Sequence, residues 1–191
     1  MKYKMRGLII DTETTGLSHN YNQVLTVGMI LAEIDDDLNF INLKHIKIKH
    51  EKYNVTGIAL KINKINLKEH NKIGINSKKA CREINDFIIE NRIKNIPLIG
   101  HNINFDLRFL RELYKKERKE FLLDLQTLDT RSIWINLRNK GIIPLHLRSN
   151  LRTLAQHFQV DYNHAHDALQ DCKITAQVFH KMNALVKENN N

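Results

Sequence analysis

At residues 7–17 the chain reads Gly-Leu-Ile-Ile-Asp-Thr-Glu-Thr-Thr-Gly-Leu. A short apolar run that breaks off into a polar, glycine-containing turn is typical of a buried β-strand followed by a loop. Residues two apart on a strand point to the same side, so the carboxylates of Asp11 and Glu13 can reach one point at the end of this strand. Two like charges held that close repel each other unless a cation lies between them, and Mg²⁺ prefers hard oxygen ligands of this kind. The stretch predicts an acidic metal-binding pair, while a polar turn that only caps the strand fits it equally well.

A second class of enzyme also opens with a strand and an acidic pair. Haloacid-dehalogenase-like phosphatases carry Asp-x-Asp-x-Thr at this place, and the first Asp is their nucleophile. Here the second acidic residue is Glu13, and the loop after it does not continue as in that family. The phosphatase is therefore kept as an alternative.

The composition describes one folded domain with a basic surface. The chain has 191 residues, of which 42% are hydrophobic, and 30 Lys and Arg residues against 21 Asp and Glu residues give a net charge of +9. A surplus of that size favours a polyanionic partner such as nucleic acid, although solubility alone would also explain it. We expect a single domain over residues 1–186 and a frayed tail over residues 187–191.

Cysteine usage and hydropathy bear on the compartment. The two cysteines, Cys81 and Cys172, lack the number and the spacing of a disulfide framework. Met1–Arg6 is basic, but the apolar run behind it is too short for a signal peptide, and no segment reaches the 18 or so apolar residues that a membrane span needs. We therefore expect reduced thiols, no membrane segment and a cytoplasmic location.

The rest of the chain alternates between strand-like and helix-like stretches. Two β-rich stretches, Gln23–Ile34 and Leu38–Lys49, flank the acidic turn Asp35–Asp37 and predict a hairpin, so the first three strands are expected to be antiparallel. A further buried strand is expected at Pro97–Gly100. Apolar residues at helical spacing predict helices that start at Ser77 and Asn104 and others that span Thr127–Arg138, Leu151–Phe158 and Asp167–Val186. The pattern predicts an α/β fold with a mixed sheet covered by helices.

A further acidic position follows the strand that ends at Gly100. The chain continues His-Asn-Ile-Asn-Phe-Asp, and Asp106 falls in the first turn of the next helix, where the helix dipole favours a carboxylate. A purely structural interpretation has Asn104 as the helix cap and Asp106 as the dipole partner. Strand ends that face the same rim of a mixed sheet would instead bring Asp106 toward Asp11 and Glu13.

The last predicted helix begins with another polar group. At residues 166–171 the chain reads His-Asp-Ala-Leu-Gln-Asp. His166 and Asp171 are not stacked neighbours on a helix, so Asp171 could bind a metal while His166 acts on a water, and an ordinary histidine pKa of about 6.5 suits proton removal. Zinc is an alternative because His157, His164 and Cys172 lie nearby, but no tight Cys/His pair of defined spacing is present.

The three segments together resemble the DEDDh exonuclease family, in the family's order and over about residues 7–180. The residues of Asp11–Leu17 are typical of the epsilon proofreading subunits, one branch of the family. Gly57–Asn63 is similar to a segment that this branch carries after the hairpin. The resemblance implies a ribonuclease-H-like fold with a mixed five-stranded sheet flanked by helices. The family's motifs Asp-x-Glu, Asn-x-x-Phe-Asp and His-x-Ala-x-x-Asp fall here on Asp11, Glu13, Asn102, Phe105, Asp106, His166, Ala168 and Asp171.

The same resemblance implies an activity and a role for each residue. It implies hydrolysis of the 3′-terminal phosphodiester of single-stranded DNA or RNA to nucleoside 5′-monophosphates by a two-metal mechanism. His166 would take the proton of the attacking water. Two Mg²⁺ or Mn²⁺ ions would be held by Asp11, Glu13, Asp106 and Asp171. The substrate would be bound by Thr14 at the 3′-hydroxyl, by Leu17 and Phe105 at the last bases, and by Asn102.

Partners other than a nucleic-acid 3′ end stay open. The chain stops soon after the last predicted helix, where the epsilon subunit continues into the extension that binds its polymerase, so a polymerase association is left open. Ribonuclease T is a dimer with basic patches, and Lys115–Lys119 and Arg148–Arg152 are candidates for that role in a homodimer, although solvated helix faces explain them as well. His164 fails the third motif, because position 166 then holds His where Ala is required. An inactive relative that only binds nucleic acid is the other functional hypothesis.

Overall fold

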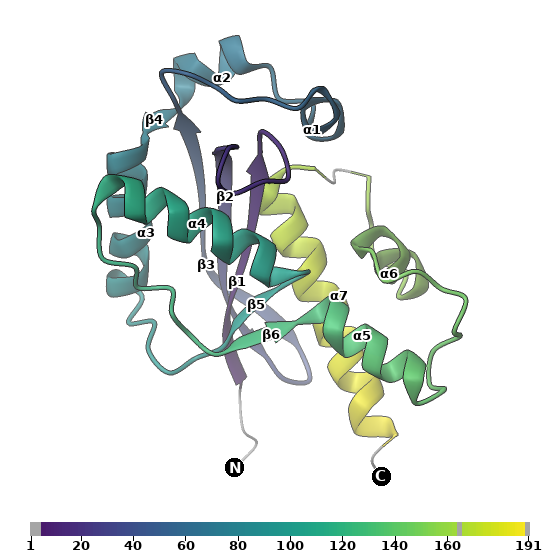
Figure 1. Cartoon of the computed structure of the whole chain (residues 1–191). Helices are drawn as coiled ribbons and strands as arrows, with labels where there is room; N and C mark the ends of the chain where they lie inside the picture. The colour runs from purple at the N-terminus through teal and green to yellow at the C-terminus, as the bar shows by residue number, and fades with distance from the viewer. Residues whose placement is uncertain (1–4, 164–165, 190–191) are drawn as a thin grey trace.

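The computed structural model describes residues 5–163 and 166–189. This part of the chain is built around one sheet with the strand order β4-β3-β2-β1-β5-β6 (Figure 1). β1, β2 and β3 are antiparallel neighbours, β5 runs parallel to β1, and β6 runs parallel to β5. The expected α/β fold with a mixed sheet is confirmed. The strands are β1 (Met5–Thr14), β2 (Val24–Ile34), β3 (Leu38–Lys49), β4 (Ile75–Asn76), β5 (Leu98–Gly100) and β6 (Thr127–Asp129).

Helices cover both faces of the sheet, with α3 and α4 on one face and α7 on the other (Figure 1). Alternate residues of β1 serve the two layers, because successive side chains of a strand point to opposite faces. Leu8 and Ile10 pack with α3 and α4, while Ile9 packs with Ala176 and Phe179 of α7. No helix in the described residues is long and apolar enough to cross a membrane. The helices are α1 (Gly57–Asn63), α2 (Leu67–Ile73), α3 (Ser77–Glu90), α4 (Ile103–Glu117), α5 (Thr130–Asn139), α6 (Leu151–His157) and α7 (Ala168–Glu188).

Two short strands differ from the expectation. The sheet has six strands in the described residues rather than five, because the two-residue strand β4 pairs with the end of β3. Thr127–Asp129, expected as the first turn of a helix, forms β6 beside β5, and α5 starts only at Thr130. β4 and β6 are too short to show an alternating pattern, and neither lies in an apolar run like the one that predicted β5.

Helix ends differ from the expectation by one or two residues. Asn76 rather than Ser77 caps α3, because its side chain accepts a hydrogen bond from the backbone N–H of Lys79. α4 begins at Ile103, one residue before the expected start. α7 continues through Glu188, two residues beyond the expected end of the domain at residue 186.

Candidate active site

The end of β1 supplies two acidic side chains. Asp11 and Glu13 lie on the sheet face that α7 covers, two residues apart as the sequence predicts. Asp11 is paired with Gly28 of β2, and a Cβ atom at Gly28 would collide with the carbonyl oxygen of Ala168. The missing side chain therefore allows the first turn of α7 to lie directly on the sheet beside Asp11.

That first turn of α7 supplies Asp171. The side chain is buried, and Oδ2 accepts a hydrogen bond of 3.2 Å from the backbone N–H of His166. Oδ1 is also buried but has no hydrogen-bond partner in the described part of the chain. Buried carboxylate oxygens are normally satisfied, so an unpartnered one points to a cation or a water at this place.

α4 brings Asp106 to the same end of β1. Its side chain is 3% exposed, and Oδ1 accepts hydrogen bonds from the backbone N–H of Thr12 at 2.9 Å and from the Thr12 hydroxyl at 2.6 Å. The chain turns sharply from β5 into α4 because Asn102 adopts a left-handed conformation, with φ of 62°. Asp106 is thus tied to the residue between Asp11 and Glu13.

Burial and mutual repulsion make the ionisation of the four carboxyl groups unfavourable. Burial, and then the charges of Asp106, Asp171 and Glu13, raise the pKa of Asp11 well above its usual value. Burial and the charge of Asp171 raise the pKa of Glu13 to about 8. Burial raises the pKa of Asp106 to about 7 and that of Asp171 to about 6, although hydrogen bonds to each carboxylate oppose the rise. As whole residues Asp11 and Glu13 are partly exposed, but protein atoms surround their carboxylates and leave little room for water. Such clustered, shifted groups mark a candidate functional site.

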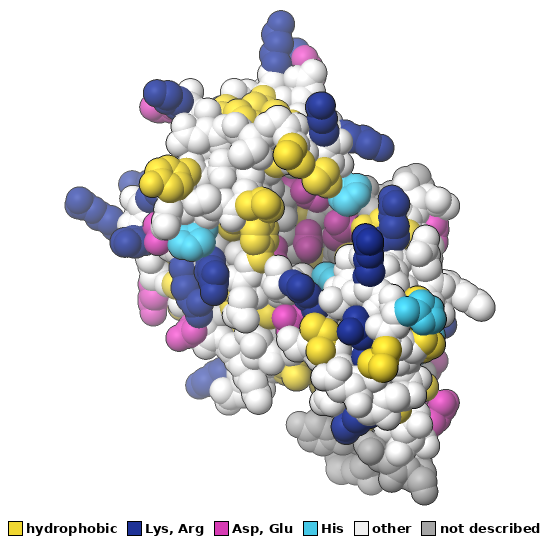
Figure 2. Space-filling view, turned by 45° about the vertical axis from the view of Figure 1, so that its right-hand side comes forward, with side chains coloured by type: hydrophobic (Ala, Val, Ile, Leu, Met, Phe, Trp, Pro, Cys, Tyr) yellow, Lys and Arg dark blue, Asp and Glu magenta, His cyan; other side chains and the backbone are white. Residues whose placement is uncertain are grey.

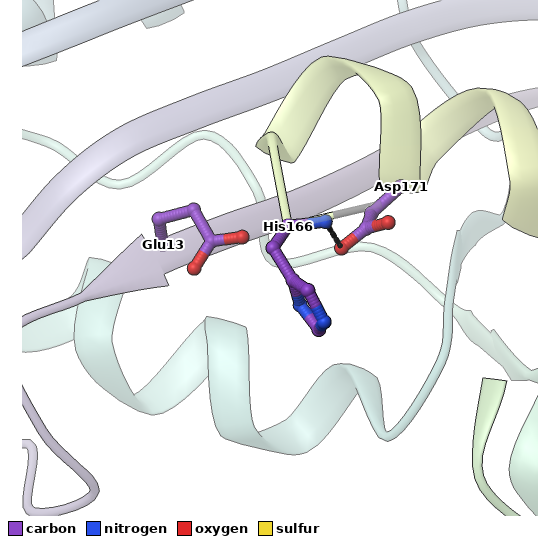
Figure 3. Close-up of side chains that lie close together, drawn as sticks. All are labelled: Glu13, His166 and Asp171. Atoms are coloured by element: carbon purple, nitrogen blue, oxygen red, sulfur yellow. Dashed lines mark hydrogen bonds between the residues drawn. The ribbon is translucent and has the colours of Figure 1, made fainter. Parts of the chain in front are cut away.

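His166 completes this group from the connection before α7 (Figure 3). A ring nitrogen of His166 and one carboxylate oxygen each of Glu13 and Asp171 lie within 4.8 Å of one another. The backbone of His166 has φ of 75°, a left-handed conformation that is uncommon for a residue with a side chain. Burial, and then the charges of Arg152 and Lys64, lower the pKa of the ring, so it is neutral and able to accept a proton near pH 7.

The residues expected to bind substrate do not all lie in one place. Leu17, Asn102 and Phe105 line a common hollow of about 290 Å³, and Leu17 is 84% exposed. Thr14 is buried, and its hydroxyl donates to the carbonyl oxygen of Gly16 inside the turn. Figure 2 shows an acidic depression with hydrophobic side chains on one side and Lys, Arg and His side chains on the other.

The residues considered for zinc are dispersed. The His157 ring packs edge-on against Trp134, with 5.2 Å between the ring centroids. Cys172 is fully buried in the core beneath α7. His164 lies outside the described residues. Within the described residues the one group of three or more metal-ligand side chains at ligand spacing is Glu13, His166 and Asp171, so neither His157 nor Cys172 joins His166 in a common site.

His45 is a neighbour of the site that sequence reasoning missed. It lies in β3 next to Gly28, on the side opposite to Asp11, so these three residues form one row across the sheet. Its Nε2 is 3.8 Å from Oδ2 of Asp167, and the other oxygen of Asp167 caps α7 by accepting two backbone N–H groups. The start of α7 therefore lies against the sheet at Gly28, in the middle of this row, and near His45 at its β3 end. The register of β3 against β2 brings His45 close to Asp167, and no sequence motif predicts this proximity.

Asn63 is the second such neighbour. Its Nδ2 donates to the carbonyl oxygen of Thr14 at 3.2 Å, and its side-chain hydrogen bond to Glu13 opposes the rise in that carboxyl's pKa. Asn63 is the last residue of α1 and is buried. In the sequence, only the resemblance of Gly57–Asn63 to a family segment pointed to this part of the chain. It did not indicate that Asn63 is the residue that reaches the site.

The fold and the acidic site define a class of enzyme. The chain belongs to the exonuclease family, because the model of that family, RNase_T, matches residues 8–179. This match confirms the resemblance to DEDDh exonucleases. It favours the exonuclease over the phosphatase that the first acidic pair had left as an alternative.

Two relatives show where such domains occur. The chain is 27% identical over 183 residues to the DNA polymerase III PolC-type of Caldanaerobacter subterraneus, an alignment that covers 92% of this chain and 11% of that protein. It is 26% identical over 191 residues to ribonuclease T of Wigglesworthia glossinidia brevipalpis, with 94% of this chain and 86% of that protein covered. The chain thus spans about a tenth of the polymerase and most of the ribonuclease.

Solved structures share the fold. A crystal structure of E. coli exonuclease I with a dT13 oligonucleotide superposes with a TM-score of 0.81 at 18% identity, over 96% of this chain and 42% of that one. The zinc-bound form of its complex with single-stranded DNA gives a TM-score of 0.78 at 20% identity, over 98% and 41%. Together with the family match, this likeness confirms the ribonuclease-H-like fold.

Proposed function

We propose that the chain is a metal-dependent 3′→5′ exonuclease that hydrolyses the terminal phosphodiester of single-stranded DNA or RNA and releases nucleoside 5′-monophosphates. The observation that carries the proposal is the meeting of Asp11, Glu13, Asp106, Asp171 and His166 at one end of β1. Membership of the exonuclease family supports the type of bond that is cut. The names of ribonuclease T and of the exonuclease I complexes with single-stranded DNA support a nucleic-acid substrate.

The donor set fits two divalent cations. Its members are carboxylate oxygens, the hard ligands that Mg²⁺ and Mn²⁺ prefer, and Oδ1 of Asp171 has no other partner in the described residues. Cations would also offset the mutual repulsion that raises the pKa of these acids. When bound, such ions lower the pKa of a water and stabilise charge on the leaving oxygen. The residues that would hold them are Asp11, Glu13, Asp106 and Asp171.

His166 is the proposed general base. Its ring nitrogen lies within 4.8 Å of the oxygens of Glu13 and Asp171, so a water beside these carboxylates is within reach of the ring. The lowered pKa leaves this nitrogen unprotonated near pH 7. Proton removal by a placed base contributes about 10²- to 10⁴-fold to a rate.

The surface beside the carboxylates offers separate places for bases and phosphates. Leu17 and Phe105 present apolar surface on which any base can stack, consistent with degradation regardless of sequence. Asn102 also lines a neighbouring hollow of about 460 Å³ with Arg131 and Arg148, and no carboxylate lines this second hollow. We assign the arginines to phosphates near the scissile bond.

We keep Thr14 as the residue that binds the 3′-hydroxyl, but its own hydroxyl can act there only as a hydrogen-bond acceptor. The hydroxyl proton is already donated to Gly16, so the oxygen can only accept from the substrate. The Thr14 carbonyl oxygen is held by Asn63. The turn after β1 is thus fixed before any substrate binds.

An oligonucleotide assay tests the proposal. Purified protein is incubated with 5′-labelled single-stranded DNA or RNA and Mn²⁺, and the products are resolved by length. We expect a ladder that shortens from the 3′ end and disappears with chelator or in Asp11→Ala, while Glu120→Ala, at an exposed position, keeps full activity. Matched DNA and RNA oligomers in the same assay give the substrate preference.

Two other outcomes would replace the proposal. Gel retardation of the oligonucleotide without any shortening would identify an inactive nucleic-acid-binding relative. Release of phosphate from small phosphoesters without shortening would contradict the exonuclease as well.

A further inference from the structure

A hollow between several elements lies away from the acidic site. It has a volume of about 540 Å³ and runs between α4, the loop after β1, the end of β3 and the start of α3. We call it the lysine groove, since four lysines stand among its lining residues. These lysines are Lys49, Lys52, Lys78 and Lys116.

The lysine groove continues the hollow in which the last bases are proposed to lie. His19 and Phe109 line both cavities, and the rings of Phe105 and Phe109 are in contact at a centroid distance of 4.8 Å. α4 starts at the acidic site and runs toward α3 (Figure 1). Phe105 and Lys116 are 11 residues apart on this helix, or about 16 Å along its axis at about 1.5 Å per residue. A strand with its 3′ end at the carboxylates would reach the groove within a few nucleotides.

The groove carries more positive than negative charge. Within the described residues, none of the four lysines forms an ion pair. Three glutamates also line the groove, and one of them, Glu112, lies 3.8 Å from Lys115, which stands outside the lining. Four lysines against three glutamates leave a positive surplus in the groove, and that surplus favours an anionic chain.

The walls of the groove are held in place by side-chain hydrogen bonds. Nε2 of His50 bonds the carbonyl oxygen of Val24 at 2.7 Å, and Nδ1 of the same ring lies 3.4 Å from the Ser77 hydroxyl. Oδ1 of Asn22 accepts from the backbone N–H of Ser18 at 3.0 Å. The bonds of His50 join the residue after β3 to β2 and α3, so the segments that carry Lys49 and Lys78 are tied to each other.

We propose that the lysine groove binds the sugar-phosphate backbone of the substrate strand several nucleotides to the 5′ side of the bond that is cut. This inference rests on the proposed function. Long oligonucleotides occupy both the acidic site and the groove, whereas a trinucleotide occupies the acidic site alone. The groove therefore lowers KM for long strands and leaves the chemical step unchanged.

The test compares strand lengths in a triple variant, Lys52→Gln/Lys78→Gln/Lys116→Gln. Its KM for a 5′-labelled dodecamer should rise about tenfold, while its kcat and its rate on a trinucleotide stay at the level of the unchanged protein. Each phosphate contact contributes about 0.7 to the slope of log K against log salt for single strands, so three lost contacts should reduce that slope by about 2. The matched control is Lys94→Gln/Lys140→Gln/Lys181→Gln, which removes the same charge at exposed positions outside the groove.

Equal KM and salt slope in the two triple variants would overturn the inference, and so would an equal loss on trinucleotide and dodecamer. Fluorescence anisotropy with the same two oligonucleotides and no metal measures binding without hydrolysis. If the unchanged protein cuts neither oligonucleotide, the proposed function fails. The groove is then still supported by a loss of dodecamer affinity confined to the first variant, and contradicted by equal affinities.

Discussion

The carboxylates and His166 meet at one site, but the molecule holds them in different ways. Asp11 and Glu13 belong to the central strand, while Asp106 and Asp171 stand in the first turns of two helices that cover opposite faces of the sheet. His166 stands in the connection before α7, in a left-handed conformation, with its backbone N–H bonded to Asp171. The acidic group is thus a product of the whole fold, whereas the histidine is placed by a local turn.

This difference separates two kinds of effect. Removing a carboxylate should change cation binding, the stability of the metal-free protein and the rate together. Removing the imidazole should change the rate and little else. The substitutions below are ordered by the size of the expected effect.

Asp106→Asn should lower the rate by about three orders of magnitude, because a cation ligand is lost. The fold should be kept, since the amide oxygen of Asn can still accept from the N–H and hydroxyl of Thr12. Single-turnover hydrolysis and circular dichroism measure the two effects. Glu120→Gln removes a carboxylate from an exposed position and serves as the control. A variant that is folded and fully active would show that Asp106 has only a structural role.

His166→Ala should lower kcat by about 10²- to 10⁴-fold, the usual contribution of a general base. Mn²⁺ affinity and oligonucleotide affinity should stay within a factor of about two, since the carboxylates remain in place. The comparison is His164→Ala, which should do much less because His164 fails the family motif. Equal losses in the two variants would refute the assignment of the base.

His45→Leu should lower kcat by about tenfold at unchanged KM, because the His45 ring stands beside the start of α7, with Nε2 3.8 Å from the carboxylate of Asp167, and so supports the segment that carries His166. His45→Gln should recover most of the loss, since its amide can donate to the same carboxylate oxygen. Steady-state kinetics of both variants and of His146→Leu, an exposed position, measure the effect. If the Leu and Gln variants lose activity equally, the contact with Asp167 does not position the base.

The metal-free protein should lose thermal stability, by a few degrees, as the pH rises from 5 to 8. Glu13, Asp106 and Asp171 have pKa values of about 8, 7 and 6 in the folded protein, against about 4 in an unfolded chain. These carboxyl groups keep protons that the unfolded chain has lost, so their contribution to the free energy of unfolding falls as the pH rises. The lowered pKa of His101, about 4, acts in the opposite direction only below about pH 6.5, the pKa of an unfolded histidine. Differential scanning calorimetry should show a smaller fall with Mn²⁺ or in Asp11→Asn, and a retained fall in His166→Ala. A flat or rising melting temperature would contradict the raised pKa values.

The features that the sequence predicted best are those set by the spacing of residues within one helix or strand. Asp11 and Glu13 lie two apart on a strand, so their shared direction follows from strand geometry alone. Apolar periodicity likewise located the hairpin of β2 and β3 and the long helices. The family motifs added which acidic residues belong together.

What the sequence could not predict depends on pairing between distant segments. Strand β6 exists because Thr127–Asp129 lies beside β5, and the contact of His45 with Asp167 exists because β3 is in register with β2 at Gly28. Neither relation leaves a periodic trace in the chain. The lysine groove was missed for the same reason, since its lysines come from β3, the loop after β3, α3 and α4.

Isothermal titration of Mn²⁺ tests the central claim most directly, because it measures the acidic group without the chemical step. In the presence of a nucleoside 5′-monophosphate we expect two ions per chain in the unchanged protein and in His166→Ala, and at most one in Asp11→Asn. Absence of binding to the unchanged protein, or equal binding in Asp11→Asn, would contradict the assignment of the carboxylates as the cation site.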